Sequence, residues 1–125
     1  TVRSAARHDA TQALVDTYRE LTTDGPLAAG VAAVYAYEAQ VPEVAAEKLN
    51  GLRDRYGVED GRTLAFFALH STLDVEHSAA EREMIRALAP TPADEDTAVE
   101  ATGRTLDAWW SFLDDVRAHC PMPVA

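Results

Sequence analysis

Residues 66–78 read FFALHSTLDVEHS and place His70, Asp74 and His77 at spacings of four and three residues. On an α-helix, which turns by about 100° per residue, these three side chains fall on one narrow face, within roughly 60° of one another. Helical bundles use imidazole nitrogens and carboxylate oxygens in such positions to hold iron or manganese. The stretch therefore predicts a helix that carries three candidate metal ligands on one face.

The three residues belong to a longer series of three- and four-residue steps, which is the spacing of a core-facing stripe on a helix. This stripe consists of Phe67, His70, Asp74, His77, Glu81, Met84 and Leu88. Burying such polar groups alone costs several kcal/mol, so they must be paired or coordinated. Glu81 is either a partner of the ligands or a surface residue, whereas Glu76 and Glu83 lie off the stripe and are expected in solvent.

The whole chain predicts an all-α fold, because Ala, Leu, Glu and Arg dominate its periodic segments and no sustained strand-like alternation occurs. We expect Pro42 to kink the second helix or split it in two, and Gly57 to close it. Asp60 and Thr91 are the expected N-caps of the third and fourth helices. The four main helices are predicted at about residues 7–23, 26–55, 61–89 and 92–118.

The larger apolar residues define a predicted buried stripe on each remaining helix. On the first helix the stripe consists of Leu14, Tyr18 and Leu21. On the second it consists of Leu27, Val31, Val34 and Val41, and on the fourth of Val99, Leu106, Trp109, Leu113 and Val116.

An acidic residue, Glu38, occupies the stripe of the second helix between Val34 and Val41. A Glu on one helix that faces a His/Asp/His set on another is an arrangement that binds iron or manganese in bundles. As an alternative, Glu38 pairs with an arginine such as Arg82 or Arg104, and each histidine is an ordinary core residue. Four such residues on two stripes favour the metal, because every added buried charge raises the cost of having no cation.

Length and charge limit the remaining possibilities. A chain of 125 residues predicts a single helical domain, residues 1–125. Its 21 acidic and 11 basic residues give a net charge of -10, which opposes binding to nucleic acid. The sequence contains no membrane-length apolar run and no signal peptide, so we expect a cytoplasmic protein without a membrane partner. A single cysteine, Cys120, excludes an internal disulfide and a zinc site built of thiolates.

Two segments, YAYEAQVPEVAAEKLNGLRDRYGV at residues 35–58 and FFALHSTLDVEHS, resemble the haem-oxygenase-like diiron oxidases and oxygenases. The resemblance is to the branch of the chlamydial protein associating with death domains; pyrroloquinoline-quinone synthase and thiaminase II are more distant relatives by fold. It implies the C-terminal portion of a haem-oxygenase-like helical bundle. It also implies an iron-dependent, oxygen-activating enzyme that acts on a small organic substrate, in cofactor or natural-product biosynthesis, with dioxygen and an external source of electrons.

By this resemblance, Glu38, His70, Asp74 and His77 fall on four of the six ligand positions of a dinuclear iron site, for which manganese is the alternative metal. Lys48 falls on a lysine that the p-aminobenzoate-forming members require, and is otherwise an ordinary exposed helix lysine. The other two ligands, a Glu and a His, would lie upstream of Thr1. We therefore expect that the chain is part of a longer enzyme, pairs with a separate N-terminal half, or forms a homodimer.

Two other classes of function remain open. Without the missing ligands, the chain could be a non-catalytic helical interaction module or a metal-poor, shortened relative that dimerises. A ferritin-like or haemerythrin-like carrier would usually show Glu-x-x-His pairs, and the predicted stripes contain none. The aromatic residues Phe66, Phe67, Trp109 and Trp110 fit a core better than a substrate cavity, so the sequence indicates no particular substrate.

Overall fold

The computed structural model describes residues 8–119, and every element in this range is helical. The elements are α1 (Asp9–Arg19), a π-helical turn η2 (Glu20–Asp24), α2 (Leu27–Glu38), α3 (Val41–Tyr56), α4 (Gly61–Leu88) and α5 (Pro92–His119). They form the four main helices that the sequence predicts, with α2 and α3 together as the second. Cys120 and the residues after it lie outside the described part. Within residues 8–119, no helix is long and apolar enough to cross a membrane.

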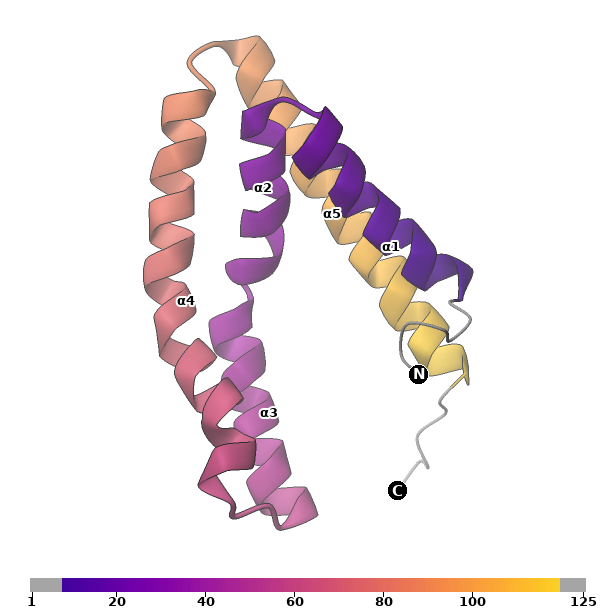
Figure 1. The fold of residues 1–125 in the computed structure, drawn as a ribbon, viewed down its shortest axis with the longest axis vertical. Coiled ribbons are helices and arrows are strands. Elements are labelled where there is room, and N and C mark those ends of the chain that lie inside the picture. The colour runs from indigo at the N-terminus through magenta and orange to yellow at the C-terminus, as the bar shows by residue number, and fades with distance from the viewer. Residues whose placement is uncertain (1–7, 120–125) are drawn as a thin grey trace.

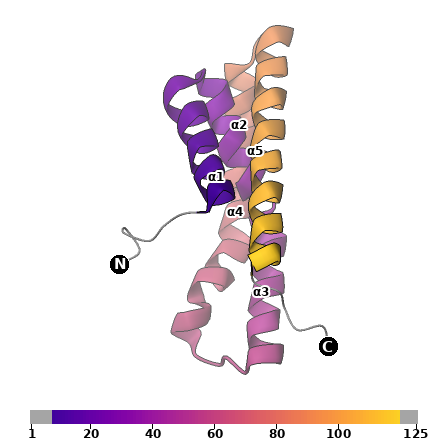
Figure 2. The same cartoon turned by 90° about the vertical axis from the view of Figure 1, so that its right-hand side faces the viewer.

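Helix α2 lies at the centre of the structure, between α4 on one side and α5 on the other (Figure 1). Helix α1 runs beside α5, and α3 continues beyond α2 to pack against the first half of α4. The second view agrees, with α3 and α4 extending past the ends of α1 and α5 (Figure 2). Helix α4 therefore borders both α2 and α3, and the junction of these two helices faces its middle.

Of the two outcomes predicted for the second helix, a kink or a split in two, the structure has the split: α2 ends at Glu38 and α3 begins at Val41. Pro42 lies in the first turn of α3, where its missing N–H costs nothing because the helix offers no acceptor there. The side-chain amide of Gln40 donates to the carbonyl of Ala36 at 2.7 Å. This bond satisfies one of the carbonyls that the end of α2 leaves free.

The predicted helix ends are confirmed. Asp60 accepts a hydrogen bond from the backbone N–H of Thr63 at 2.8 Å and caps α4. Thr91 and Asp94 form a reciprocal capping box at the start of α5, with N–H to side-chain distances of 3.2 and 3.3 Å. Gly57 ends α3 with a φ of 63°, in the left-handed region that glycine adopts most easily.

The core lies where η2, α2 and α5 meet, and small side chains dominate it. It consists of Leu21, Ala29, Ala32, Ala33, Ala98 and Ala101, with Tyr18 and Ile85 packed against it. Gly30 belongs to the same contact, since a Cβ atom at this position would lie 3.2 Å from the carbonyl oxygen of Leu21. The backbones of these helices therefore approach closely, which holds α2 in a fixed position between α4 and α5.

The buried stripes predicted for α2 and α5 are partly wrong. Leu27 is 68% exposed and Val99 is 70% exposed, whereas the neighbouring Ala28 and Ala98 are buried. Leu113 and Val116 on α5 and Met84 on α4 are also exposed. The helices turn their alanines inward because the close packing of their backbones leaves no room for larger side chains. On α1 and η2, the predicted burial of Leu14 and Leu21 is confirmed.

Candidate metal centre

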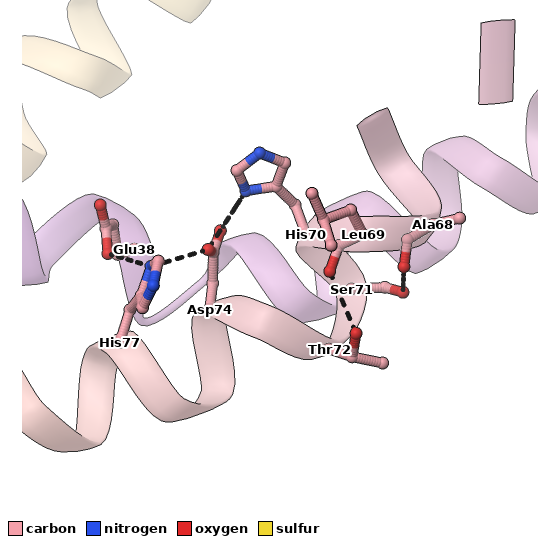
Figure 3. A network of polar contacts seen from close by, with 8 residues as sticks. All are labelled: Glu38, Ala68, Leu69, His70, Ser71, Thr72, Asp74 and His77. Carbon is pink, nitrogen blue, oxygen red and sulfur yellow. Dashed lines mark hydrogen bonds and ion pairs between the residues drawn. The ribbon is translucent and has the colours of Figure 1, made fainter. Parts of the chain in front are cut away.

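The junction of α2 and α3 brings a carboxylate onto the middle of α4. Glu38 is the last residue of α2, and one donor atom from each of Glu38, Asp74 and His77 lies within 4.8 Å of the others. Nδ1 of His77 lies 3.7 Å from Oε2 of Glu38 and 3.4 Å from Oδ1 of Asp74 (Figure 3). Three of the four predicted ligands therefore converge from two helices on one point.

The fourth predicted ligand, His70, meets this group through Asp74. Nδ1 of His70 lies 2.9 Å from Oδ2 and 3.1 Å from Oδ1 of Asp74, so the carboxylate stands between two imidazoles (Figure 3). The side chain of Asp74 is only 4% exposed, which makes it the most enclosed member of the site. The ring of His70 packs on Phe66 with 4.3 Å between the ring centres. These contacts hold His70 next to the other three residues.

Glu81 adds a further carboxylate, one turn of α4 beyond His77. Burial, the charge of Glu38 and a hydrogen bond with the Glu38 carboxylate raise the pKa of Glu81 to about 7. Its Oε2 atom is buried and has no hydrogen-bond partner among residues 8–119. From the sequence, Glu81 was either a partner of the ligands or a surface residue. The structure places it against Glu38.

No lysine or arginine among the described residues forms an ion pair with Glu38, Asp74 or Glu81. Arg104 pairs with Glu20 at 2.8 Å, and the guanidinium of Arg82 lies over the ring of Tyr35. The alternative that Glu38 pairs with either arginine is therefore wrong in this structure. Among the described residues, Glu38 and Asp74 form ion pairs with imidazoles alone, and Glu81 lies against the carboxyl group of Glu38.

The position of Glu38 on its helix adds to this negative charge. It stands at the C-terminus of α2, where the helix dipole is negative, and the last turn of α2 contains no basic residue. A carboxylate at such a position is unfavourable by about 0.3–1 kcal/mol. A bound cation would offset this repulsion and the repulsion among the three carboxyl groups.

The residues present fit an iron or manganese ion. Carboxylate oxygens and imidazole nitrogens are the ligands that these ions take in helical bundles. The buried Oε2 of Glu81 lacks a partner in the described part of the chain, and the proton that Glu81 keeps up to about pH 7 compensates part of the negative charge. A divalent ion held by Glu38, Asp74 and His77 would supply positive charge in place of this proton and would favour ionised Glu81.

Aromatic side chains fix α2 next to the site. The ring of Tyr37 stacks on Trp109 of α5, with 4.9 Å between ring centres and 12° between planes. Nε1 of Trp109 donates to the hydroxyl oxygen of Tyr18 at 3.0 Å, so α1, α2 and α5 are joined. Burial raises the pKa of the Tyr18 hydroxyl, an effect that the bond from Trp109 partly opposes. The last turn of α2, which carries Glu38, is thus held from the side opposite to α4.

The other predicted aromatic core residues behave differently from one another. Phe67 and Trp109 are half-buried, as expected of residues at the edge of a core. Phe66 is 60% exposed and Trp110 is 65% exposed, so the prediction that these two residues pack in the core is wrong. Phe66 nevertheless contacts the ring of His70.

Lys48 lies on the exposed side of α3. Its ammonium nitrogen stands 5.9 Å from the centre of the Phe67 ring, and Phe67 precedes His70 by about one turn of α4. This contact places Lys48 towards the His70 end of the site. Its catalytic role stays a prediction.

The chain has matches both to a known protein family and to individual curated proteins. Residues 1–110 match a family described as iron-containing redox enzymes. The chain is 42% identical over 109 residues to a 4-aminobenzoate synthase of Nitrosomonas europaea, a match that covers 87% of this chain and 44% of that protein. It is also 36% identical over 111 residues to a 4-aminobenzoate synthase of Chlamydia pneumoniae. This match covers 86% of this chain and 49% of that protein. The chain spans about half the length of the curated relatives it matches.

Proposed function

We propose that this chain, which belongs to the haem-oxygenase-like family of iron-containing redox enzymes, binds iron beside the junction of α2 and α3. We further propose that this iron site is part of an oxygen-activating oxidase or oxygenase. The observation that carries the proposal is the convergence of Glu38 from α2 on Asp74 and His77 from α4. Bound iron would supply redox chemistry between dioxygen and a small organic substrate.

Each residue of the site has a distinct part in this proposal. Glu38, Asp74 and His77 hold the ion, and His70 completes the set of ligands next to Asp74. Glu81 holds a proton near neutral pH and releases it when a cation binds, because the cation favours the ionised carboxylate. This proton leaves from the carboxyl group that lies against Glu38.

The specific activity that we propose is the formation of 4-aminobenzoate, which the names of the relatives state for those proteins. The match covers less than half of the Nitrosomonas europaea relative, so the whole reaction is proposed to need residues besides those matched here. The family resemblance implies a further Glu and a further His as ligands of the second iron. Lys48 is proposed to take part in this reaction from the His70 end of the site.

The family resemblance implies that the p-aminobenzoate-forming members sacrifice a tyrosine of their upstream segment, which would supply the carbon skeleton of the product. The experiment therefore loads the chain with Fe²⁺ under anaerobic conditions and then adds dioxygen and a reductant, alone or together with the unmatched half of the Nitrosomonas europaea relative. Mass spectrometry detects 4-aminobenzoate. We expect product from the pair of proteins, and none when Asp74→Asn is used. Glu83→Gln, which changes an exposed carboxylate of the same helix, serves as the control.

Two failures have different meanings. Iron binding without product from the pair would overturn the 4-aminobenzoate proposal and leave the iron site in place. A chain that takes up no iron would overturn both proposals.

The alternative of a helical interaction module also has support in the structure. Phe66, Leu69 and Val75 of α4 are each more than half exposed, and such apolar residues often mark a surface that another chain covers. We propose that a second copy, or a segment equivalent to the unmatched half of the relatives, covers them. Sedimentation velocity tests whether a second copy of the chain covers these residues. A monomer at every concentration would exclude the homodimer, and a stable dimer without iron would favour the non-catalytic module.

A further inference from the structure

A second group of metal-type side chains lies away from the iron site, at the free ends of α1 and α5. His8 precedes α1, and Asp115 and His119 lie in the last turns of α5. One donor atom from each of the three lies within 4.8 Å of the others. The group belongs to the α1–α5 pair, whereas the iron site belongs to α2 and α4 (Figure 1).

We propose that His8, Asp115 and His119 form a binding site for a divalent transition-metal ion of the zinc class. Two imidazoles and one carboxylate are a donor set that zinc takes, and water fills the remaining position. Calcium and magnesium prefer oxygen ligands throughout, so two imidazoles disfavour them. A site of nitrogen and oxygen donors also binds Zn²⁺ more tightly than Fe²⁺. Zinc is therefore the ion to test.

The distances within the group are those of donors around one ion. Nδ1 of His8 lies 3.1 Å from Oδ2 of Asp115, and one donor atom from each of the three residues lies within 4.8 Å of the other two. The two imidazole rings meet edge to face, with 4.5 Å between their centres. Neighbouring ligands of a tetrahedral ion, each bonded at about 2.0–2.1 Å, stand at comparable separations. Small side-chain rotations would therefore close the site.

A backbone contact prepares His119 for this role. Its Nδ1 lies 2.9 Å from the carbonyl oxygen of Asp115, and a carbonyl oxygen only accepts hydrogen bonds. The contact assigns the proton to Nδ1, which leaves the lone pair of Nε2 free for a metal. Histidine ligands in metal sites are commonly oriented by such a bond from the other ring nitrogen.

Access and charge also favour a cation here. The side chains of His8 and His119 are more than half exposed, so ions in solution reach them. The net charge of -10 attracts cations to the surface as a whole. A bound ion would join the start of α1 to the end of α5. Because the unfolded chain does not hold the three ligands together, such an ion would stabilise the folded state.

The test titrates Zn²⁺ by calorimetry into the untagged chain that carries His77→Ala, which removes a ligand of the iron site. Two variants of this parent are compared with it. His119→Ala removes a proposed ligand, and Asp114→Asn, the matched control, alters the exposed neighbour of Asp115. We expect His119→Ala to weaken zinc binding at least about tenfold and Asp114→Asn to leave it unchanged. Zinc should also raise the melting temperature of the parent, and His119→Ala should abolish this rise.

Nuclear magnetic resonance of chains with ¹⁵N-labelled histidine identifies the ligands directly. Zinc should shift the ring resonances of His8 and His119 in the parent. The circular dichroism spectrum of His119→Ala must match that of the parent, which shows that the variant is folded. Any of three results would overturn the proposal. These are equal zinc affinity in the parent and His119→Ala, no zinc binding by the parent, and ring resonances of His8 and His119 that do not move.

Discussion

Oε2 of Glu38 lies 3.7 Å from Nδ1 of His77, so the last residue of α2 meets the middle of α4. The contact lies at the break between two helices, because α2 ends at Glu38 and α3 begins at Val41. Asp74 approaches the same imidazole to 3.4 Å from within α4. The geometry of the proposed iron site therefore depends on how α2 packs against α4.

Replacement of Glu38 tests whether α2 contributes a ligand. Glu38→Gln removes one charged donor, and the side chain is 28% exposed, so the fold should remain intact. We expect the affinity for Fe²⁺ to fall at least about tenfold, because charged oxygen ligands bind such ions better than amide oxygens do. Anaerobic competition with a chromophoric chelator measures this affinity. Glu43→Gln, an exposed change in α3, should bind iron as the unaltered chain does; equal affinities in all three proteins would remove Glu38 from the site.

The pH dependence of stability tests the contact between Glu81 and Glu38. In the folded chain Glu81 keeps its proton up to about pH 7, whereas an unperturbed glutamate loses its proton near 4.5. Folding therefore takes up a proton between these pH values. The free energy of unfolding of the metal-free chain should fall as the pH rises through this range, by on the order of 1–2 kcal/mol after allowance for solvent screening.

Urea unfolding at a series of pH values between 4.5 and 7.5 measures this fall. Glu81→Gln cannot ionise and should lack this part of the pH dependence, whereas Glu83→Gln should retain it. The same slope in the unaltered chain and in Glu81→Gln would show that Glu81 titrates normally.

A larger side chain at Ala33 tests the packing of α2. Ala33 is completely buried among the alanines that join α2 to its neighbours. Ala33→Leu should lower the free energy of unfolding by about 1–3 kcal/mol, because the close-packed helices must separate to admit it. Ala79→Leu makes the same change on an exposed part of α4 and should shift stability by no more than about 0.5 kcal/mol. Equal urea midpoints for the two variants would contradict the packing described.

The hydrogen bond from Trp109 to Tyr18 is expected to stabilise the side of α2 that faces away from α4. Tyr18→Phe leaves the indole N–H without its partner in a half-buried setting, at a cost of about 0.5–1.5 kcal/mol. Tyr56→Phe removes the hydroxyl of a tyrosine that is 74% exposed and should have little effect. Thermal unfolding of the two variants provides the comparison, and matching melting temperatures would mean that the bond contributes nothing.

The sequence predicted the α4 part of the site because His70, Asp74 and His77 lie on one helix, where spacing alone fixes their relative positions. Glu38 was predicted from a stripe that the structure places only partly in the core. Large apolar residues defined that stripe, while packing at close range selected the alanines beside them. Periodicity thus identified the helices correctly and misjudged how far α2 and α5 are rotated.

Contacts between distant segments were harder to predict. His8 and His119 are exposed near the two ends of the described chain, and their meeting at Asp115 follows from the pairing of α1 with α5. The i, i+4 spacing of Asp115 and His119 was the only local signal of this group. Likewise, the sequence placed Glu81 on the ligand stripe, and only the packing of α2 on α4 brought it against Glu38.

Iron content tests the account most directly. The chain with His119→Ala, which removes the proposed zinc site, is loaded with Fe²⁺ under anaerobic conditions, desalted and analysed for iron per chain. We predict stoichiometric iron in this protein and almost none after the further change Asp74→Ala, with Glu83→Gln as a control that retains iron and with helical circular dichroism preserved in all three. Iron-free protein before the Asp74 change, or iron that remains bound after it, would contradict the proposed metal centre.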